Sequence, residues 1–173
     1  MKGIFIDIEK CTGCKSCEIY CAVSHSASKQ IFSAVFEDPL PAERVKVESY
    51  NEFSIPIQCR HCEEAPCVDA CPSGALSKEI ETGIVAMDQE RCIGCWMCAM
   101  VCPFGAIIPK MDSKVIIKCD RCPDLDEPAC VNACPTNALL FGELGEAMKK
   151  SRKKAAQITI SAIKKEISIG GLT

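Results

Sequence analysis

Sixteen of the 173 residues are cysteine, and they fall into four groups of four with none left over. A cysteine thiolate is a soft ligand that suits zinc, copper(I) and iron–sulfur centres. Four complete sets of four therefore predict four metal centres, each held by four thiolates. In chain order, groups I to IV consist of Cys11, Cys14, Cys17 and Cys21; Cys59, Cys62, Cys67 and Cys71; Cys92, Cys95, Cys98 and Cys102; and Cys119, Cys122, Cys130 and Cys134.

The spacing inside the groups discriminates between metals. Groups I and III read C-x2-C-x2-C-x3-C, whereas groups II and IV have a longer gap before the third cysteine. Structural zinc sites typically use two C-x2-C pairs separated by a longer segment. Three close cysteines instead suit three iron corners of a [4Fe–4S] cluster, and in two-cluster ferredoxins the fourth cysteine reaches the other cluster. We therefore predict four [4Fe–4S] clusters; the alternatives are three such clusters with a different fourth centre, zinc sites and disulfide bonds.

An internal repeat extends beyond the cysteines. The segments CVDACPSGAL (67–76) and CVNACPTNAL (130–139) agree at seven of ten positions, so the chain reads as two copies of a two-group unit. Proline follows the last cysteine in groups II, III and IV, as in bacterial ferredoxins. Group I has Ala22 at this position, which we interpret as a tolerated variation because the ligand itself is present.

Few large apolar side chains are available for a conventional core. Aromatic residues make up 5% of the chain, and the hydrophobic fraction of 48% includes the cysteines. Clusters bonded to the chain would replace part of that core, so we expect the protein without metal to be largely unfolded. The formal charge is −3, and each oxidised cluster would add about −2. Nucleic acid is disfavoured as a partner, because phosphate binding needs a basic surface.

Neither a targeting signal nor a membrane span is expected. The start of the chain, Met1 to Lys10, lacks the apolar run and cleavage site of a signal peptide. The longest uncharged stretch, Trp96 to Pro109, is too short for a span and contains Pro103. A reducing cytoplasm is therefore the expected location, and there this many cysteines bind metal more often than they pair.

Short regular elements are expected around the cysteine loops. Each C-x2-C-x2-C is expected to be irregular, and the x3 step to the last cysteine fits one helical turn. The runs Val45–Glu48 and Phe53–Gln58 predict a hairpin inserted between groups I and II. Other strands are predicted at Gly3–Asp7, Ile84–Asp88 and Val115–Lys118, and a basic amphipathic helix over Glu143–Ile167, ended by Gly170 and Gly171.

The segment from group II to the end of group IV resembles the four-cluster iron–sulfur subunits of the dimethyl sulfoxide reductase type. The matching sequences are CRHCEEAPCVDACPSGA (59–75), CIGCWMCAMVCPFGA (92–106) and KCDRCPDLDEPACVNACPTNAL (118–139). The resemblance covers about residues 1–142. It implies an α+β fold of two fused bacterial-ferredoxin-like (βαββαβ) modules with four [4Fe–4S] clusters, an inserted hairpin and a C-terminal helix.

The resemblance also implies how the cysteines are shared, since that family pairs group I with group IV and group II with group III. The clusters would then form a row between two docking faces. The implied ligand sets are Cys11, Cys14, Cys17 and Cys134 for cluster 1; Cys59, Cys62, Cys67 and Cys102 for cluster 2; Cys92, Cys95, Cys98 and Cys71 for cluster 3; and Cys119, Cys122, Cys130 and Cys21 for cluster 4.

This pairing divides the chain into three parts. Residues 1–58 hold group I and the inserted hairpin, and they are expected to pack with residues 111–142 as an outer module. Residues 59–110 form the inner dicluster module, and residues 143–173 form the C-terminal basic helix and tail. The basic run of that helix is either a solvated face, a dock for an acidic partner or a contact with anionic lipid.

Motifs for a substrate site are missing from the sequence. It has no G-x-G-x-x-G after a strand, no P-loop and no H-E-x-x-H, and no cysteine remains as a nucleophile. We therefore predict an electron carrier that serves an oxidoreductase complex and is not itself an enzyme.

The tail indicates a partner. The segment EAMKKSRKKAAQ (146–157) resembles the tail of the small soluble partner of nickel–iron carbon monoxide dehydrogenase. This resemblance implies a relay from that enzyme to a hydrogenase or a flavin NAD(P) oxidoreductase. The alternatives are the iron–sulfur subunit of a formate dehydrogenase, a hydrogenase or a molybdopterin oxidoreductase, and an iron–sulfur redox sensor.

Several residues near the ligands have more than one interpretation. His61, between two cysteines of group II, is a cluster ligand, a hydrogen-bonding residue near cluster sulfur or a surface histidine. Trp96, inside group III, packs over a cluster, contacts a partner or relays electrons, whereas Met97 and Met100 are expected in the core. A cation beside a ligand, such as Lys118, either raises the potential of a cluster or is a solvated charge.

Overall fold

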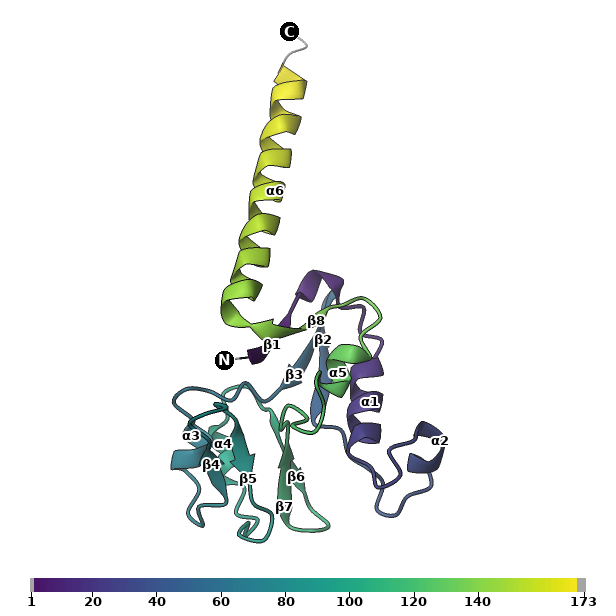
Figure 1. Cartoon of the computed structure of the whole chain (residues 1–173), viewed down its shortest axis with the longest axis vertical. Coiled ribbons are helices and arrows are strands. Elements are labelled where there is room, and N and C mark those ends of the chain that lie inside the picture. Colours follow the sequence, from purple (N-terminus) through teal and green to yellow (C-terminus); the bar gives the residue numbers. More distant parts are fainter. Residues whose placement is uncertain (1, 171–173) are drawn as a thin grey trace. The chain divides into compact units, whose positions relative to one another are not determined.

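The third cysteine of every group lies in a short helix, as the sequence predicts. The structure, a computed structural model, describes residues 2–170, apart from the side chains of residues 150, 162 and 165–170. The loops that hold the first two cysteines are irregular. The helices that carry Cys17, Cys67, Cys98 and Cys130 are, in that order, α1 (Ser16–Ser24), α3 (Pro66–Asp69), α4 (Met97–Val101) and α5 (Ala129–Asn132) (Figure 1).

All the described strands form two-stranded sheets. The pairs are β1 (Lys2–Ile6) with β8 (Leu139–Glu143), β2 (Val45–Tyr50) with β3 (Phe53–Gln58), β4 (Leu76–Lys78) with β5 (Val85–Met87), and β6 (Ile107–Lys110) with β7 (Val115–Lys118). The inserted hairpin and the strands predicted near residues 3–7, 84–88 and 115–118 are confirmed, with ends shifted by one or two residues. Strands β4, β6 and β8 have three to five residues and give no alternating pattern long enough to predict them.

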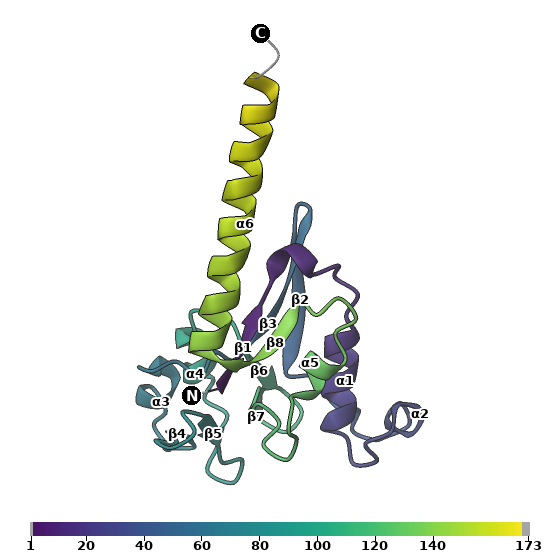
Figure 2. The ribbon, with the colours of Figure 1, turned by 45° about the horizontal axis from the view of Figure 1, so that its top comes forward.

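One hydrophobic core joins the two ends of the cysteine-containing region. It contains Cys17 and Cys21 from group I, Cys130 from group IV and Val45 and Val47 from β2. Helix α1 packs against α5 and β2 (Figure 2). The backbone N–H of Asp7 donates to the carbonyl oxygen of Ala138 at 2.8 Å. Segments more than a hundred residues apart in sequence are therefore held together here.

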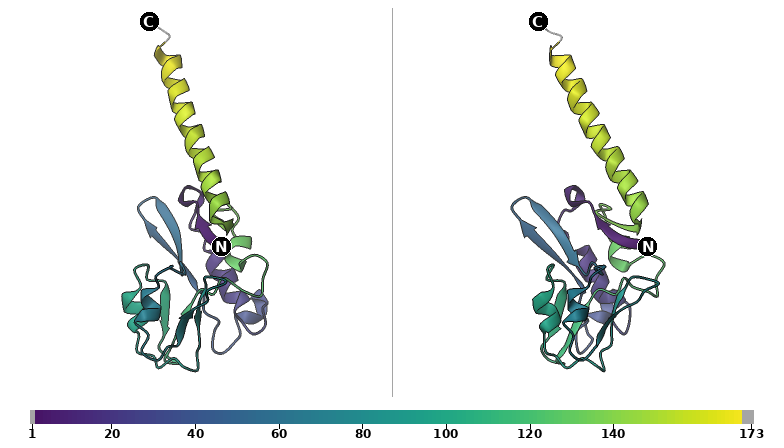
Figure 3. Two further views of the ribbon diagram at one scale, coloured as in Figure 1. Left: turned by 60° about the vertical axis from the view of Figure 1, so that its left-hand side comes forward. Right: turned by 90° about the vertical axis from the view of Figure 1, so that its left-hand side faces the viewer.

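A second core lies between groups II and III. Leu76, Val85, Ile107 and Ile116 pack there with the third cysteines of both groups. Helices α3 and α4 contact each other and lie with the β4–β5 and β6–β7 hairpins (Figure 3). The two cores thus combine group I with IV and group II with III.

The expected core packing of Met97 and Met100 is wrong. Their side chains are 49% and 82% exposed, because the single turn of α4 directs Cys98 and Ala99 toward the core and leaves its other face in solvent. Two other short helices, the 3-10 helix η1 (Ile8–Lys10) and α2 (Ile31–Ala34), complete residues 4–141, which form one compact unit.

The other unit contains α6 (Leu144–Gly170), close to the range of the predicted basic helix. Glycine 171, predicted to help end this helix, lies outside the described residues. Exposed side chains of α6 include the apolar Met148, Ile158 and Ile163 and the basic Lys149 and Arg152. Across residues 2–170, no helix combines the length and the apolar character that crossing a bilayer requires.

Candidate metal centres

Each cysteine loop turns through the left-handed region of backbone conformation immediately before its second cysteine. The φ angles there are +69° at Gly13, +50° at His61, +66° at Gly94 and +63° at Arg121. In group IV the cysteine that follows, Cys122, is left-handed as well, with φ of +51°. Turns of this kind can direct successive N–H groups to one side and form a concave, anion-binding backbone. The loops are therefore built to surround a negatively charged group, even though two of the four positions are not glycine.

Backbone N–H groups also donate directly to the fourth cysteines. The donors to Cys102 and Cys134 are the N–H groups of Ala106 and Ala138, four residues further on, at 3.4 and 3.2 Å. The proline after each of these cysteines ends the helix and begins the turn that supplies the donor. Hydrogen bonds of this kind tune the reduction potential of iron–sulfur centres.

Group I achieves the same result by a different route. Because Ala22 replaces proline, α1 continues past Cys21 to Ser24 and forms no such turn. The Cys21 sulfur instead accepts a hydrogen bond at 3.2 Å from the N–H of Arg44, at the start of the inserted hairpin. The departure from the ferredoxin pattern is therefore compensated by a segment that bacterial ferredoxin spacing does not contain.

The structure brings Cys21 of group I beside group IV. Burial raises the pKa of the Cys21 thiol to about 12, and negative charge on Cys119 and Cys122 acts in the same direction. Burial likewise raises the pKa of Cys130, with further contributions from Cys119, Cys21, Cys122 and Cys17. Cys21, Cys119, Cys122 and Cys130 therefore lie close enough to interact, and they are the set expected to hold cluster 4.

Cysteines of groups II and III also meet. One small, partly open cavity is lined by Cys71, Cys92, Cys95 and Cys98, the set expected to hold cluster 3, together with Trp96. Burial raises the pKa of Cys98 to about 11, and charge on Cys71, Cys67 and Cys92 adds to the rise. Trp96 is half-buried and packs against this core, so one face of the cavity is shielded from water.

The other two expected sets are less enclosed. Burial raises the pKa of Cys67, and charge on Cys59 and Cys102 acts in the same direction, which places three members of the cluster 2 set together; Cys62 is half-buried. In the cluster 1 set, Cys17 is buried, Cys14 is exposed, and Cys11 and Cys134 are half-buried. Cys134 packs against the core that contains Cys17.

The donor set fits [4Fe–4S] clusters. All sixteen cysteines are free thiols, with no disulfide among them. Thiolates are the ligands of such clusters, and backbone N–H groups already face several of the sulfur atoms. The buried Nε2 of His61 has no protein partner in the described residues and is a further polar group that a bound cluster could satisfy.

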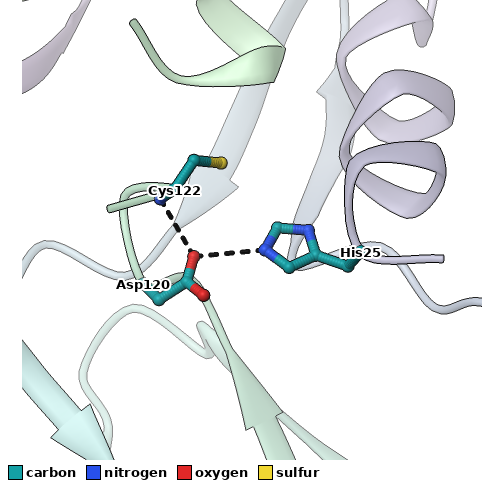
Figure 4. Close-up of side chains that lie close together, drawn as sticks. All are labelled: His25, Asp120 and Cys122. Carbon is teal, nitrogen blue, oxygen red and sulfur yellow. Dashed lines mark hydrogen bonds and ion pairs between the residues drawn. The ribbon is translucent and has the colours of Figure 1, made fainter. Parts of the chain in front are cut away.

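A carboxylate that the sequence did not reveal ties group I to group IV. Asp120 accepts hydrogen bonds from His25 Nε2 at 3.2 Å and from the N–H of Cys122 at 3.0 Å (Figure 4). It also forms an ion pair with Arg44. Burial opposes ionisation, but these three groups hold the pKa of Asp120 well below its usual range. One possible metal-ligand atom from each of His25, Asp120 and Cys122 lies within 4.8 Å of the other two.

This network gives His25, at the C-terminal end of α1, a structural role. Its Nδ1 lies 2.7 Å from the carbonyl oxygen of Cys21, so the histidine bridges a group I cysteine to the group IV loop. His25 and Asp120 are 95 residues apart, and no local pattern in one sequence connects them.

Comparisons with known proteins agree with this donor chemistry. The model of the 4Fe-4S dicluster domain family matches residues 50–144, and that of a 4Fe-4S binding domain matches residues 8–24. An iron-sulfur protein of Rhodospirillum rubrum is 40% identical over 158 residues, which are 82% of each chain.

Two relatives from Escherichia coli (strain K12) carry more specific descriptions. The B subunit of anaerobic dimethyl sulfoxide reductase is 37% identical, over 89% of this chain and 79% of the relative. Electron transport protein HydN is 36% identical, over 87% of this chain and 93% of the relative. The cysteines of the present chain therefore bind [4Fe–4S] clusters.

Proposed function

The chain belongs to the 4Fe-4S dicluster domain family and is an iron–sulfur electron-transfer protein, and on this premise we propose that it relays electrons through four [4Fe–4S] clusters. The clusters would take up and release single electrons, which pass between a catalytic oxidoreductase subunit and a downstream acceptor. The chain's own residues hold the clusters, limit water and set the potentials. The proposed location is the reducing cytoplasm.

We further propose the ligand sets given above, in which groups I and IV exchange their fourth cysteines, as do groups II and III. The observation that carries this proposal is the proximity of Cys21 to Cys119, Cys122 and Cys130, since Cys21 would otherwise lie with its own group. The cavity lined by Cys71 and three cysteines of group III supports the second exchange. The three-part division at residues 58/59, 110/111 and 142/143 remains part of this proposal.

Iron analysis of paired cysteine variants tests the exchange. The protein, purified without oxygen, should contain about sixteen iron atoms, and Cys134→Ser should retain about twelve. Adding Cys14→Ser to Cys134→Ser should remove no further cluster, because both would serve cluster 1. Adding Cys122→Ser instead should remove a second cluster. The opposite pattern would show that Cys134 belongs with group IV.

The repeat supplies a matched control. Cys71 occupies the position in segment 67–76 that Cys134 occupies in segment 130–139. Cys71→Ser should therefore also lose one cluster, but its defect should be shared with Cys95→Ser rather than with Cys14→Ser. A chain that is colourless and free of iron when prepared anaerobically would contradict the whole function.

For the catalytic partner we propose nickel–iron carbon monoxide dehydrogenase, which would make this a protein of the kind called CooF. The resemblance of segment 146–157 supports this choice, and a hydrogenase or a flavin NAD(P) oxidoreductase would accept the electrons. The choice of partner is tested by mixing the oxidised chain with that dehydrogenase and carbon monoxide and monitoring the visible absorbance of the clusters. We expect this absorbance to fall rapidly even when the enzyme is present at much less than one molecule per chain.

A second candidate function is electron transfer to a molybdopterin reductase, as its iron–sulfur subunit. The 37% identity to a dimethyl sulfoxide reductase subunit favours it. The same absorbance assay distinguishes the two candidates. If the second is right, a molybdopterin reductase and its substrate would oxidise the prereduced chain. Carbon monoxide and the dehydrogenase would then leave the oxidised chain unreduced.

A further inference from the structure

Lys118 brings a positive charge into the interior. Its side chain is 4% exposed, and its Nζ donates to the carbonyl oxygens of Val85 and Cys119, the second at 2.9 Å. Among the side chains that the structure describes, no carboxylate forms an ion pair with it. A buried ammonium without a negative partner is unfavourable, so an anion bound nearby would stabilise it.

His61 is hydrogen-bonded to Val85 as well, but through the backbone N–H of that residue. It is 5% exposed, and its Nδ1 accepts a hydrogen bond at 3.0 Å from the N–H of Val85. Because Nδ1 accepts this hydrogen bond, it carries no proton, and the ring is neutral. A neutral ring that accepts at Nδ1 carries its proton on Nε2, and that buried N–H has no protein acceptor in the described residues.

The backbone of Val85 therefore holds both the His61 ring and the Lys118 ammonium group. This residue is 1% exposed in β5 and uses its N–H for His61 and its carbonyl oxygen for Lys118. His61 lies between Cys59 and Cys62, two cysteines of group II. The third cysteine, Cys67, packs in the same core cluster as Val85, to whose carbonyl oxygen Lys118 is bonded.

We propose that His61 and Lys118, both held by Val85, tune the group II cluster, with the Nε2–H of His61 donating to a cluster or cysteine sulfur and the ammonium group of Lys118 supplying a positive charge. Both would stabilise the reduced, more negative form and so raise the reduction potential of that one cluster. This inference rests on the proposed function, because it needs a cluster at Cys59, Cys62 and Cys67.

The charge is tested by redox titration of the whole protein followed by electron paramagnetic resonance. Lys118→Met should lower one midpoint potential by 59 mV or more, equivalent to a tenfold change in the equilibrium constant for one electron. Lys118→Arg should keep most of the potential. Lys149→Met removes the same charge from an exposed position of α6 and should leave every potential in place.

The hydrogen bond is tested without disturbing either residue. The chain contains two histidines, so in His25→Gln labelled with ¹⁵N-histidine the label resides at His61 alone. Pulsed electron paramagnetic resonance should then detect ¹⁵N coupling to a reduced cluster, and His61→Leu should abolish it.

The outcomes separate the two proposals. A full iron content with unchanged potentials in Lys118→Met, or absence of ¹⁵N coupling in His25→Gln, would overturn the inference and leave the electron-relay function intact. If Lys118→Met does not assemble, the ¹⁵N measurement still decides. Absence of iron from the unaltered chain would overturn the proposed function itself.

Discussion

Two glycines in cluster loops offer a controlled test of how tightly group III is packed. Gly94 and Gly105 have similar left-handed conformations, with φ of +66° and +59°. A Cβ at residue 94 would overlap the carbonyl oxygen of Lys114 and lie 3.1 Å from its carbonyl carbon, whereas a Cβ at residue 105 would meet nothing within 4 Å. Gly94→Ala and Gly105→Ala therefore differ in one respect, the collision with the β6–β7 turn.

The expected magnitudes follow from these two contributions. An alanine held in the left-handed region costs about 1–2 kcal/mol, and both variants carry this cost. Gly94→Ala adds a collision with backbone, and overpacking of this kind costs about 1–3 kcal/mol. A difference of roughly 2 kcal/mol corresponds to a factor of about 30 in rate if the strain is released as the cluster is lost.

The assay is the half-life of the visible cluster absorbance in a fixed concentration of guanidinium chloride, measured without oxygen, with iron content determined at the start. Cluster loss is irreversible, so a rate is the appropriate measure of stability. We expect Gly94→Ala to lose absorbance about 30-fold faster than Gly105→Ala. Equal half-lives for the two variants would refute the packing of the group III loop against Lys114.

Three other changes test the fold around the clusters. Ala22→Pro restores the bacterial ferredoxin pattern but should destabilise the chain by about 3 kcal/mol, because residue 22 lies inside α1. The variant should therefore lose its clusters faster than the parent in guanidinium chloride, and slower loss would contradict this reasoning. Ile116→Ala empties a fully buried position and should cost about 2–5 kcal/mol, whereas Ile80→Ala, at a residue 94% exposed, should stay within about 0.5 kcal/mol; guanidinium half-lives of the two compare them. Removal of iron by a chelator should abolish the near-ultraviolet circular dichroism of the chain, because cysteines make up much of both cores. An iron-free chain that keeps this circular dichroism would disprove the structural role of the clusters.

Several features of the fold could be predicted because they depend on neighbours in sequence. The four cysteine groups, the helical turn at each third cysteine and the hairpin Val45–Tyr50 with Phe53–Gln58 are specified by spacing and local residue type. The short strands β4, β6 and β8 could not be recognised, because they gain their hydrogen bonds from partners and have too few residues to show a pattern.

The interpretation of single side chains was less secure. Burial of His61 excludes the surface histidine that the sequence left possible, and exposure of Met100 contradicts the expected core position. Helix α4 is only five residues long, so its sequence does not indicate which side faces the core. Such assignments depend on what lies opposite the residue in space.

The sequence by itself determined the chemistry of this protein, because thiolate ligands and the loops that present them are encoded within stretches of about a dozen residues. Only the tertiary structure decided what surrounds each sulfur. The Asp120 carboxylate between His25 and Arg44, the Arg44 N–H on Cys21, and the peptide of Val85 between His61 and Lys118 all join segments at least 23 residues apart. Contacts at such separations arise from packing of the whole chain, and they leave no periodic or local signal in the order of its amino acids.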